Sequence, residues 1–216
     1  MRHLLNEWIG SKFTLHESAL PALDILPFTL QNFPKERASS QEKLGLKKWD
    51  FIYPSSGDVH KNHLTLLEAW INLSEEGIFP SLCLTIDTSN KKLLDRLSKS
   101  IKTYGLDITN LGNLQHGELL HYYHDSKSLI FPSMIESFGL PLIEAASFGL
   151  PILAPELDYV RDVCDPVQTF DPKSFKSIAN AVKRHLKIPN SSIKLLSPNE
   201  FWNAIAPKNM TLPHVK

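Results

Sequence analysis

The chain has 216 residues, 42% of them hydrophobic and 21% charged, as expected for a soluble globular protein with a sizeable core. Its 23 basic and 23 acidic residues cancel, so no overall field favours nucleic acid or an anionic membrane surface, and neither is expected as a partner. Cys83 and Cys164 have no metal-binding spacing, which predicts buried thiols in a reducing cytoplasm.

Residues 1–47 contain several prolines and a polar stretch but no clear alternation of strands and helices. We interpret them as an amino-terminal remnant of another domain, or a linker to it. Residues 1–8 contain no long apolar stretch, so no signal peptide is expected. The most apolar region, 138–155, is interrupted by Glu144 and by prolines, so no membrane-spanning segment is expected and a cytoplasmic location is predicted.

Strands and helices alternate through residues 48–190. Strands are expected at 50–54, 81–86, 108–111, 128–131, 151–154 and 167–170, and helices at 62–74, 91–104, 118–124, 140–148, 159–163 and 172–186. Asp171 is expected to cap the last of these helices, with Pro172 at its first position. Short loops between the elements predict an α/β fold, a Rossmann-like doubly wound parallel sheet. Residues 191–216 are expected to form a short helix, near 198–205, and a polar tail.

The loops at the carboxyl ends of parallel strands gather at one edge of a sheet. Loops 55–61, 87–90, 112–117 and 133–139 should therefore share one rim. This arrangement brings Lys61, Glu136 and Glu144 towards a single pocket.

The segment 131–152 is the most informative part of the chain. It predicts a buried strand, a loop with Glu136, a helix that begins after Gly139, and a turn into another strand. The backbone N–H groups at the helix start lack intrahelical partners and suit a phosphate or sugar hydroxyls. Gly139 allows close approach of a ligand to the backbone. Glu144, about one turn into the helix, can accept both hydroxyls of a ribose, so the pattern favours a sugar nucleotide.

Each of these residues also has a purely structural interpretation. Glu136 can cap the helix, Glu144 can be a solvated helix residue, and Lys61 can be a surface lysine. A cation at a helix start is disfavoured unless an anion is present, which favours the functional interpretation of Lys61. The histidines at i, i+3 spacing (60 and 63, 121 and 124) lack the carboxylate or cysteine that would complete a ligand set, so no metal is expected.

With these residues in view, the chain resembles the nucleotide-sugar-binding, carboxyl-terminal half of retaining glycosyltransferases of the GT-B architecture, the group 1 or family-four class. The resemblance runs from about residue 51 to 170. It is carried by Tyr53-Pro54, His60-Lys61-Asn62-His63, Leu111-Gly112, Pro132-Ser133, Glu136 and Glu144 with Phe138-Gly139-Leu140-Pro141 between them, and Gly149-Leu150-Pro151.

The resemblance implies a transfer of a sugar from a nucleoside-diphosphate sugar with retention of configuration, without metal or other cofactor. Polysaccharide biosynthesis is the implied setting. Lys61 would bind the diphosphate and, with Glu136, act in catalysis, while Glu144 would hold the ribose. The implied donor-binding set is Lys61, Glu136, Ser137, Phe138, Gly139, Leu140, Glu144 and, beside the base, Gly112 with the residues up to His116.

Two departures from the family's pattern stand out. Many relatives place an arginine six residues before the lysine, where this chain has Ser55. A GT-B enzyme also has a second, amino-terminal domain that binds the acceptor, and this chain has room for one domain only. The leading interpretation is a glycosyltransferase or its donor-binding domain, whether a truncated gene product, an isolated domain or one part of a split enzyme, with a separate amino-terminal acceptor-binding domain as a possible partner. The alternatives are a non-catalytic nucleotide-sugar-binding module and a scaffold.

Overall fold

The computed structural model describes residues 47–189 together with Glu200 and Trp202. The predicted amino-terminal remnant, apart from Lys47, lies outside the described residues, as does nearly all of segment 191–216. Within the helix expected at 198–205, only Glu200 and Trp202 are described, and both are helical.

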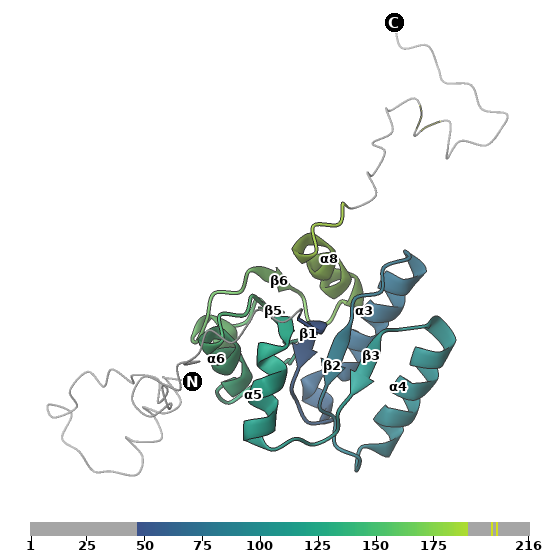
Figure 1. Ribbon diagram of the computed structural model, residues 1–216. Coiled ribbons are helices and arrows are strands. Elements are labelled where there is room, and N and C mark those ends of the chain that lie inside the picture. Colours follow the sequence, from purple (N-terminus) through teal and green to yellow (C-terminus); the bar gives the residue numbers. More distant parts are fainter. Residues whose placement is uncertain (1–46, 190–199, 201, 203–216) are drawn as a thin grey trace, which may run out of the picture.

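Six parallel strands form one sheet in the order β3-β2-β1-β4-β5-β6, with helices packed around it (Figure 1). The strands are β1 (Trp49–Tyr53), β2 (Leu82–Leu84), β3 (Ile108–Asn110), β4 (Ser126–Ile130), β5 (Ile152–Pro155) and β6 (Gln168–Phe170). The helices are the 3₁₀ turn η2 (Val59–Lys61), α3 (His63–Glu75), α4 (Lys91–Tyr104), α5 (His116–His124), α6 (Leu140–Ser147), α7 (Asp158–Arg161) and α8 (Phe175–His185). The strand order reverses direction at β1, which confirms the predicted doubly wound, Rossmann-like α/β fold.

The helices fall into two groups. Helix α3 packs against α4 and α8, whereas α5 and α6 both pack against β4 (Figure 1). Strand β1 lies between β2 and β4, and Phe51, Ile52 and Tyr53 are fully buried. Burial of successive residues, which point to opposite faces of the sheet, requires cover on both faces.

Aromatic side chains lock the central strands to their neighbours. The ring of Phe51 meets Trp70 of α3 edge to face with 5.7 Å between ring centroids, and Tyr53 meets Phe131 in the same way at 5.5 Å. Each large buried side chain contributes roughly 1.5–3 kcal/mol of transfer free energy. This packing fixes the carboxyl ends of β1 and β4, and therefore the two loops that follow them.

The start of the last helix differs from the prediction. The helix α8 begins at Phe175, and its N-cap is Ser174, whose Oγ accepts a hydrogen bond from the Ser177 N–H at 3.2 Å. The Asp171 carboxylate instead accepts from the N–H of Lys173 at 2.9 Å, closing a local turn. Because this turn holds the chain outside the helix for three residues, the prediction of Asp171 as N-cap was wrong.

In the described part of the chain, no helix is both long and apolar enough to cross a membrane.

Candidate functional site

Hydrogen bonds join the loops that follow β1 and β4 at the carboxyl edge of the sheet. The carbonyl of His60 accepts hydrogen bonds from the Met134 N–H at 2.9 Å and from the Ser133 hydroxyl at 3.3 Å. The loop after β2 joins the same edge, because the Ser55 N–H donates to Thr85 Oγ1 at 2.9 Å. The rim predicted from the parallel topology is confirmed for these loops.

The side chain of Asn62 holds three loops of this rim together, and we call it the clamp; sequence reasoning missed this role. Its buried side-chain amide donates to the carbonyls of Pro132 at 3.1 Å and Pro172 at 2.7 Å, joining the loops after β1, β4 and β6. Its backbone is left-handed, with φ of 61°, a conformation that asparagine tolerates better than most residues. An asparagine directly before a helix was the available signal, but a single sequence does not reveal partners up to 110 positions away.

Lys61 and Glu136, both predicted as site residues, form a direct ion pair. The Lys61 ammonium lies 2.7 Å and 2.9 Å from the two carboxylate oxygens, and only 18% and 9% of the two side chains are exposed. The hydroxyl of Tyr53 donates to the Lys61 carbonyl at 2.7 Å and so fixes the backbone of this residue. Burial raises the pKa of Tyr53 well above its usual value, so this hydroxyl stays a neutral donor. The Glu136 carboxylate therefore supplies the anion that the sequence predicts beside the Lys61 cation.

The amino end of α6 offers backbone donors beside this pair. Gly139 occupies the N-cap with φ of 73°, and Pro141 follows in the first turn. Within residues 47–189, the N–H groups of Phe138, Gly139 and Leu140 donate to no backbone or side-chain acceptor. Ser137 and Leu140 are exposed. The open helix end predicted from the sequence is therefore present, with glycine where the backbone requires it.

Glu144 is not the solvated helix residue of the structural interpretation, because it is only 7% exposed. The hydroxyl of Tyr123 on α5 donates to Glu144 Oε2 at 2.8 Å, and His116 Nδ1 lies 3.6 Å from Oε1. The Tyr123 ring in turn stacks on Phe148, with 5.6 Å between the ring centroids. Sequence reasoning did not find Tyr123, although it placed His116 near the base.

Gly112 lies in the loop between β3 and α5, with φ of 76°, and a Cβ there would meet nothing within 4 Å. It lies in the loop that leads to His116, and its place beside the base stays a prediction. The structure records no contact between Gly112 and the other predicted site residues.

Ser55, at the position where the family resemblance implies an arginine, takes part in a local network. Its hydroxyl donates to the Ser56 carbonyl at 2.9 Å and lies 3.2 Å from His63 Nε2, which also lies 2.7 Å from the Ser56 carbonyl. Burial lowers the pKa of His63 to about 4, so its imidazole is neutral at pH 7. The position contributes hydroxyl and imidazole groups to the rim and no second cation.

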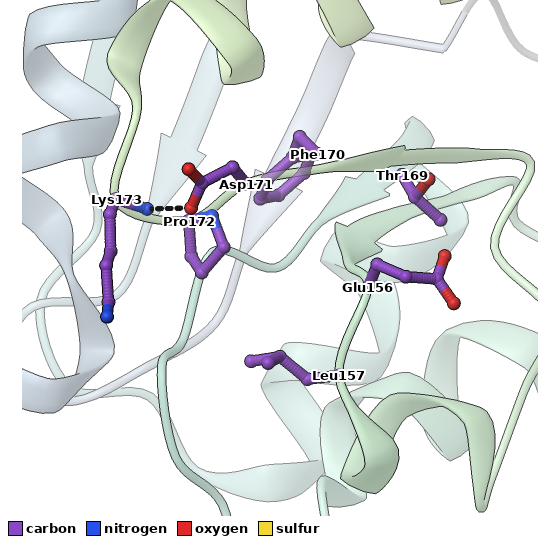
Figure 2. Close-up of a pocket in the computed structure, with 7 residues that line it drawn as sticks. All are labelled: Glu156, Leu157, Thr169, Phe170, Asp171, Pro172 and Lys173. Atoms are coloured by element: carbon purple, nitrogen blue, oxygen red, sulfur yellow. Dashed lines mark hydrogen bonds between the residues drawn. The ribbon is translucent and has the colours of Figure 1, made fainter.

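A pocket of about 570 Å³ lies at the carboxyl ends of β5 and β6 (Figure 2). It is lined by Glu156, Leu157, Thr169, Phe170, Asp171, Pro172 and Lys173. The Asn62 bond to the Pro172 carbonyl links this pocket to the Lys61 loop. Sequence reasoning missed the pocket because it considered only the loops after β1 to β4.

The described residues contain no cluster of three or more histidine, cysteine, aspartate or glutamate side chains that could hold a metal ion. Cys83 and Cys164 are both free thiols, and burial raises the pKa of Cys83 to about 12. Lys61 with Glu136, and His116 with Glu144, are the charged contacts of the site.

The chain is similar in sequence to the serotype-specific mannosyltransferase WbdA of Escherichia coli, with 28% identity over 159 residues that cover 70% of this chain and 19% of the relative. It is similar in structure to a glycosyltransferase from Rickettsia africae, with a TM-score of 0.56 and 21% identity over 64% of this chain and 37% of that one. HepE from Anabaena, solved with UDP and glucose, gives a TM-score of 0.54 and 17% identity over 72% of this chain and 44% of that one.

The chain thus spans about a fifth of the length of the curated relatives that it matches first. The family model for glycosyl transferases group 1 matches residues 34–197, well over half of the sequence. The protein therefore belongs to the group 1 glycosyl transferases.

Proposed function

We propose that this chain carries the donor-binding domain of a GT-B glycosyltransferase that transfers a sugar from a nucleoside-diphosphate sugar with retention of configuration. The observation that carries the proposal is the meeting, on one rim, of the Lys61–Glu136 pair, the open amino end of α6 and the buried Glu144. A cation, backbone N–H donors and carboxylates are together the groups that the diphosphate, the sugar and the ribose of such a donor require.

The proposed roles follow from the charges. The diphosphate lies against the open helix end and pairs with the Lys61 ammonium in place of Glu136. The Glu136 carboxylate is then available to bind the transferred sugar. Negative charge grows on the departing diphosphate during transfer, and a fixed ammonium with a helix N-terminus stabilises that charge. Since these groups supply positive charge themselves, we propose that neither a metal nor another cofactor is needed.

The relatives support the class of substrate. WbdA is a mannosyltransferase, and HepE was solved with UDP and glucose. By analogy, this chain binds a nucleotide sugar and serves the synthesis of a polysaccharide. The described domain contains one sheet, so we propose that the acceptor is held by a separate amino-terminal domain and that this domain alone turns over weakly or not at all.

Titration calorimetry tests the donor site, with UDP-, GDP- and ADP-sugars added to the full chain. We expect one donor to bind, and we expect Glu144→Gln and Lys61→Met each to weaken it at least about tenfold, as loss of a charged hydrogen bond does. The matched control is Lys99→Met, an exposed lysine on α4, which should bind as the wild type. No heat with any donor would refute the assignment.

A second candidate, a module that binds the nucleotide sugar without transferring it, is favoured by Ser55. With a hydroxyl where many relatives have arginine, the rim has one fewer cation for the leaving diphosphate. Release of nucleoside diphosphate separates the candidates when acceptor and an acceptor-binding domain are supplied. Release that survives EDTA supports the metal-free transferase, whereas tight donor binding without any release supports the module.

A further inference from the structure

Tyr123 of α5 and Glu144 of α6 form a buried polar pair. Tyr123 is fully buried, Glu144 is 7% exposed, and the bond from the hydroxyl to Oε2 measures 2.8 Å. The two residues are 21 positions apart, and their hydrogen bond joins two different helices, α5 and α6. Neither packing nor capping of either helix requires a hydroxyl and a carboxylate here.

The pair makes the two carboxylate oxygens unequal. Oε2 is taken by Tyr123, whose ring is held by its stack on Phe148. Oε1 has His116 Nδ1 as its neighbour at 3.6 Å, which is beyond hydrogen-bond distance, and the His116 side chain is 62% exposed. Burial, together with the charge of Glu144, raises the pKa of Tyr123 well above its usual value, so the phenol acts only as a donor.

We propose that Tyr123 is the positioning residue of Glu144: it holds Oε2 and thereby presents Oε1, beside the exposed side chain of His116, to the ribose hydroxyls of the donor. The proposal rests on the proposed function, in which Glu144 binds the ribose. A carboxylate held at one oxygen loses less rotational freedom when the other binds a ligand, so its hydrogen bonds to the ribose are preorganised.

The role differs from simple stabilisation in a way that can be measured. If Tyr123 only supported packing, its hydroxyl would matter equally for every ligand of the rim. If it positions Glu144, its hydroxyl matters for ligands that have ribose hydroxyls and for proteins that still have Glu144.

The experiment measures binding of UDP, GDP and ADP to the full chain by calorimetry, and then compares the tightest of them with its 2′,3′-dideoxy counterpart. The variants are Tyr123→Phe, Glu144→Gln and the double substitution, all of which keep side-chain volume. The matched control is Tyr122→Phe, the neighbouring tyrosine on the same helix. Thermal unfolding, followed by circular dichroism, sets the temperature at which every variant is folded.

We expect Tyr123→Phe to weaken the ribonucleotide about tenfold, as the loss of one hydrogen bond to a charged group does. The same change should alter binding of the dideoxy ligand, and of the ribonucleotide to Glu144→Gln, by less than about twofold, the usual error of additivity. Tyr122→Phe should bind both ligands as the wild type does.

Equal weakening of both ligands by Tyr123→Phe would overturn the proposal, and so would unchanged binding of both while Glu144→Gln weakens the ribonucleotide alone. A different result would refute the ribose role of Glu144 itself. In that case the wild type would bind the ribonucleotide and the dideoxy ligand equally well, and the role of Tyr123 would fall with that of Glu144.

Discussion

Replacement of Asn62 by alanine removes the clamp that joins three loops of the rim. The side-chain amide is buried and donates to the carbonyls of Pro132 and Pro172, which have no other hydrogen-bond donor within residues 47–189. The change therefore removes two bonds and leaves two carbonyls without their partner. It also places alanine at φ of 61°, where its Cβ crowds the backbone.

The magnitude follows from these two contributions. Each lost hydrogen bond costs about 1 kcal/mol, and alanine in the left-handed region adds about 1 kcal/mol more, so we expect unfolding free energy to fall by about 3 kcal/mol. Asn62→Gly loses the same bonds but adopts positive φ freely. The greater conformational freedom of glycine in the unfolded chain offsets part of that advantage, so Asn62→Gly should be more stable than Asn62→Ala by less than about 1 kcal/mol.

Urea unfolding, followed by the fluorescence of the buried Trp49 and Trp70, measures these differences. The matched control is Asn72→Ala within α3, because the Asn72 side chain makes no hydrogen bond with the described residues and alanine is the better helix former. Its stability should stay equal or rise slightly. A loss below about 1 kcal/mol for Asn62→Ala would refute the clamp, because that is the worth of a single ordinary bond.

Three further predictions concern the rim. Lys61→Met leaves the carboxylate of Glu136 buried without its partner, so urea unfolding should show a loss of about 2 kcal/mol, less than the 3–5 kcal/mol of a fully buried pair, and Lys61→Met with Glu136→Gln should recover most of it. Gly139→Ala should cost about 1–2 kcal/mol for its positive φ, and its Cβ would lie 3.1 Å from Leu142 Cδ1, so hydrogen exchange should show earlier opening of α6. For His63, burial lowers the folded-state pKa to about 4, below the unfolded value near 6.5, so the stability from its neutral form is complete above pH 6.5 and is lost as the pH falls towards 4. Between pH 7.5 and 5 the loss should be about 2 kcal/mol, and His63→Gln should remove this component; equal pH dependence of both proteins would contradict it.

The sequence predicts much of the fold because its signals there are local. Apolar runs such as Phe51-Ile52-Tyr53 can be buried only as strands of a covered parallel sheet, and short loops leave few alternatives. The parallel topology then places the carboxyl-end loops on one edge. That rule alone predicts that Lys61 and Glu136, 75 positions apart, lie on one rim, and the ion pair between them confirms it.

The contacts that complete the site are not local, and the sequence does not predict them. Periodicity indicates which residues of a helix are apolar but not that Tyr123 of α5 faces Glu144 of α6. The same holds for Asn62, whose partner Pro172 follows the last strand. The N-cap prediction for Asp171 was wrong for a local reason. An aspartate-proline pair is typical of both a helix start and a turn, and here it forms a turn because Ser174 caps the helix instead.

The burial of charge at this rim is itself an argument for a ligand. Replacement of a buried ion pair by apolar residues of similar volume is often neutral or stabilising, so the Lys61–Glu136 pair is weak evidence for a purely structural role. The same applies to the Tyr123–Glu144 pair. Phenylalanine in place of Tyr123 and an apolar residue in place of Glu144 could pack beside Phe148 without either polar group. Two nearly buried carboxylates, each held by one donor from a different element and each beside an open helix end or an exposed histidine, are expected where a polar ligand supplies the remaining hydrogen bonds. For this reason the loss of ligand binding in Glu144→Gln, without a matching loss of stability, is the result that would most directly separate a functional from a structural carboxylate.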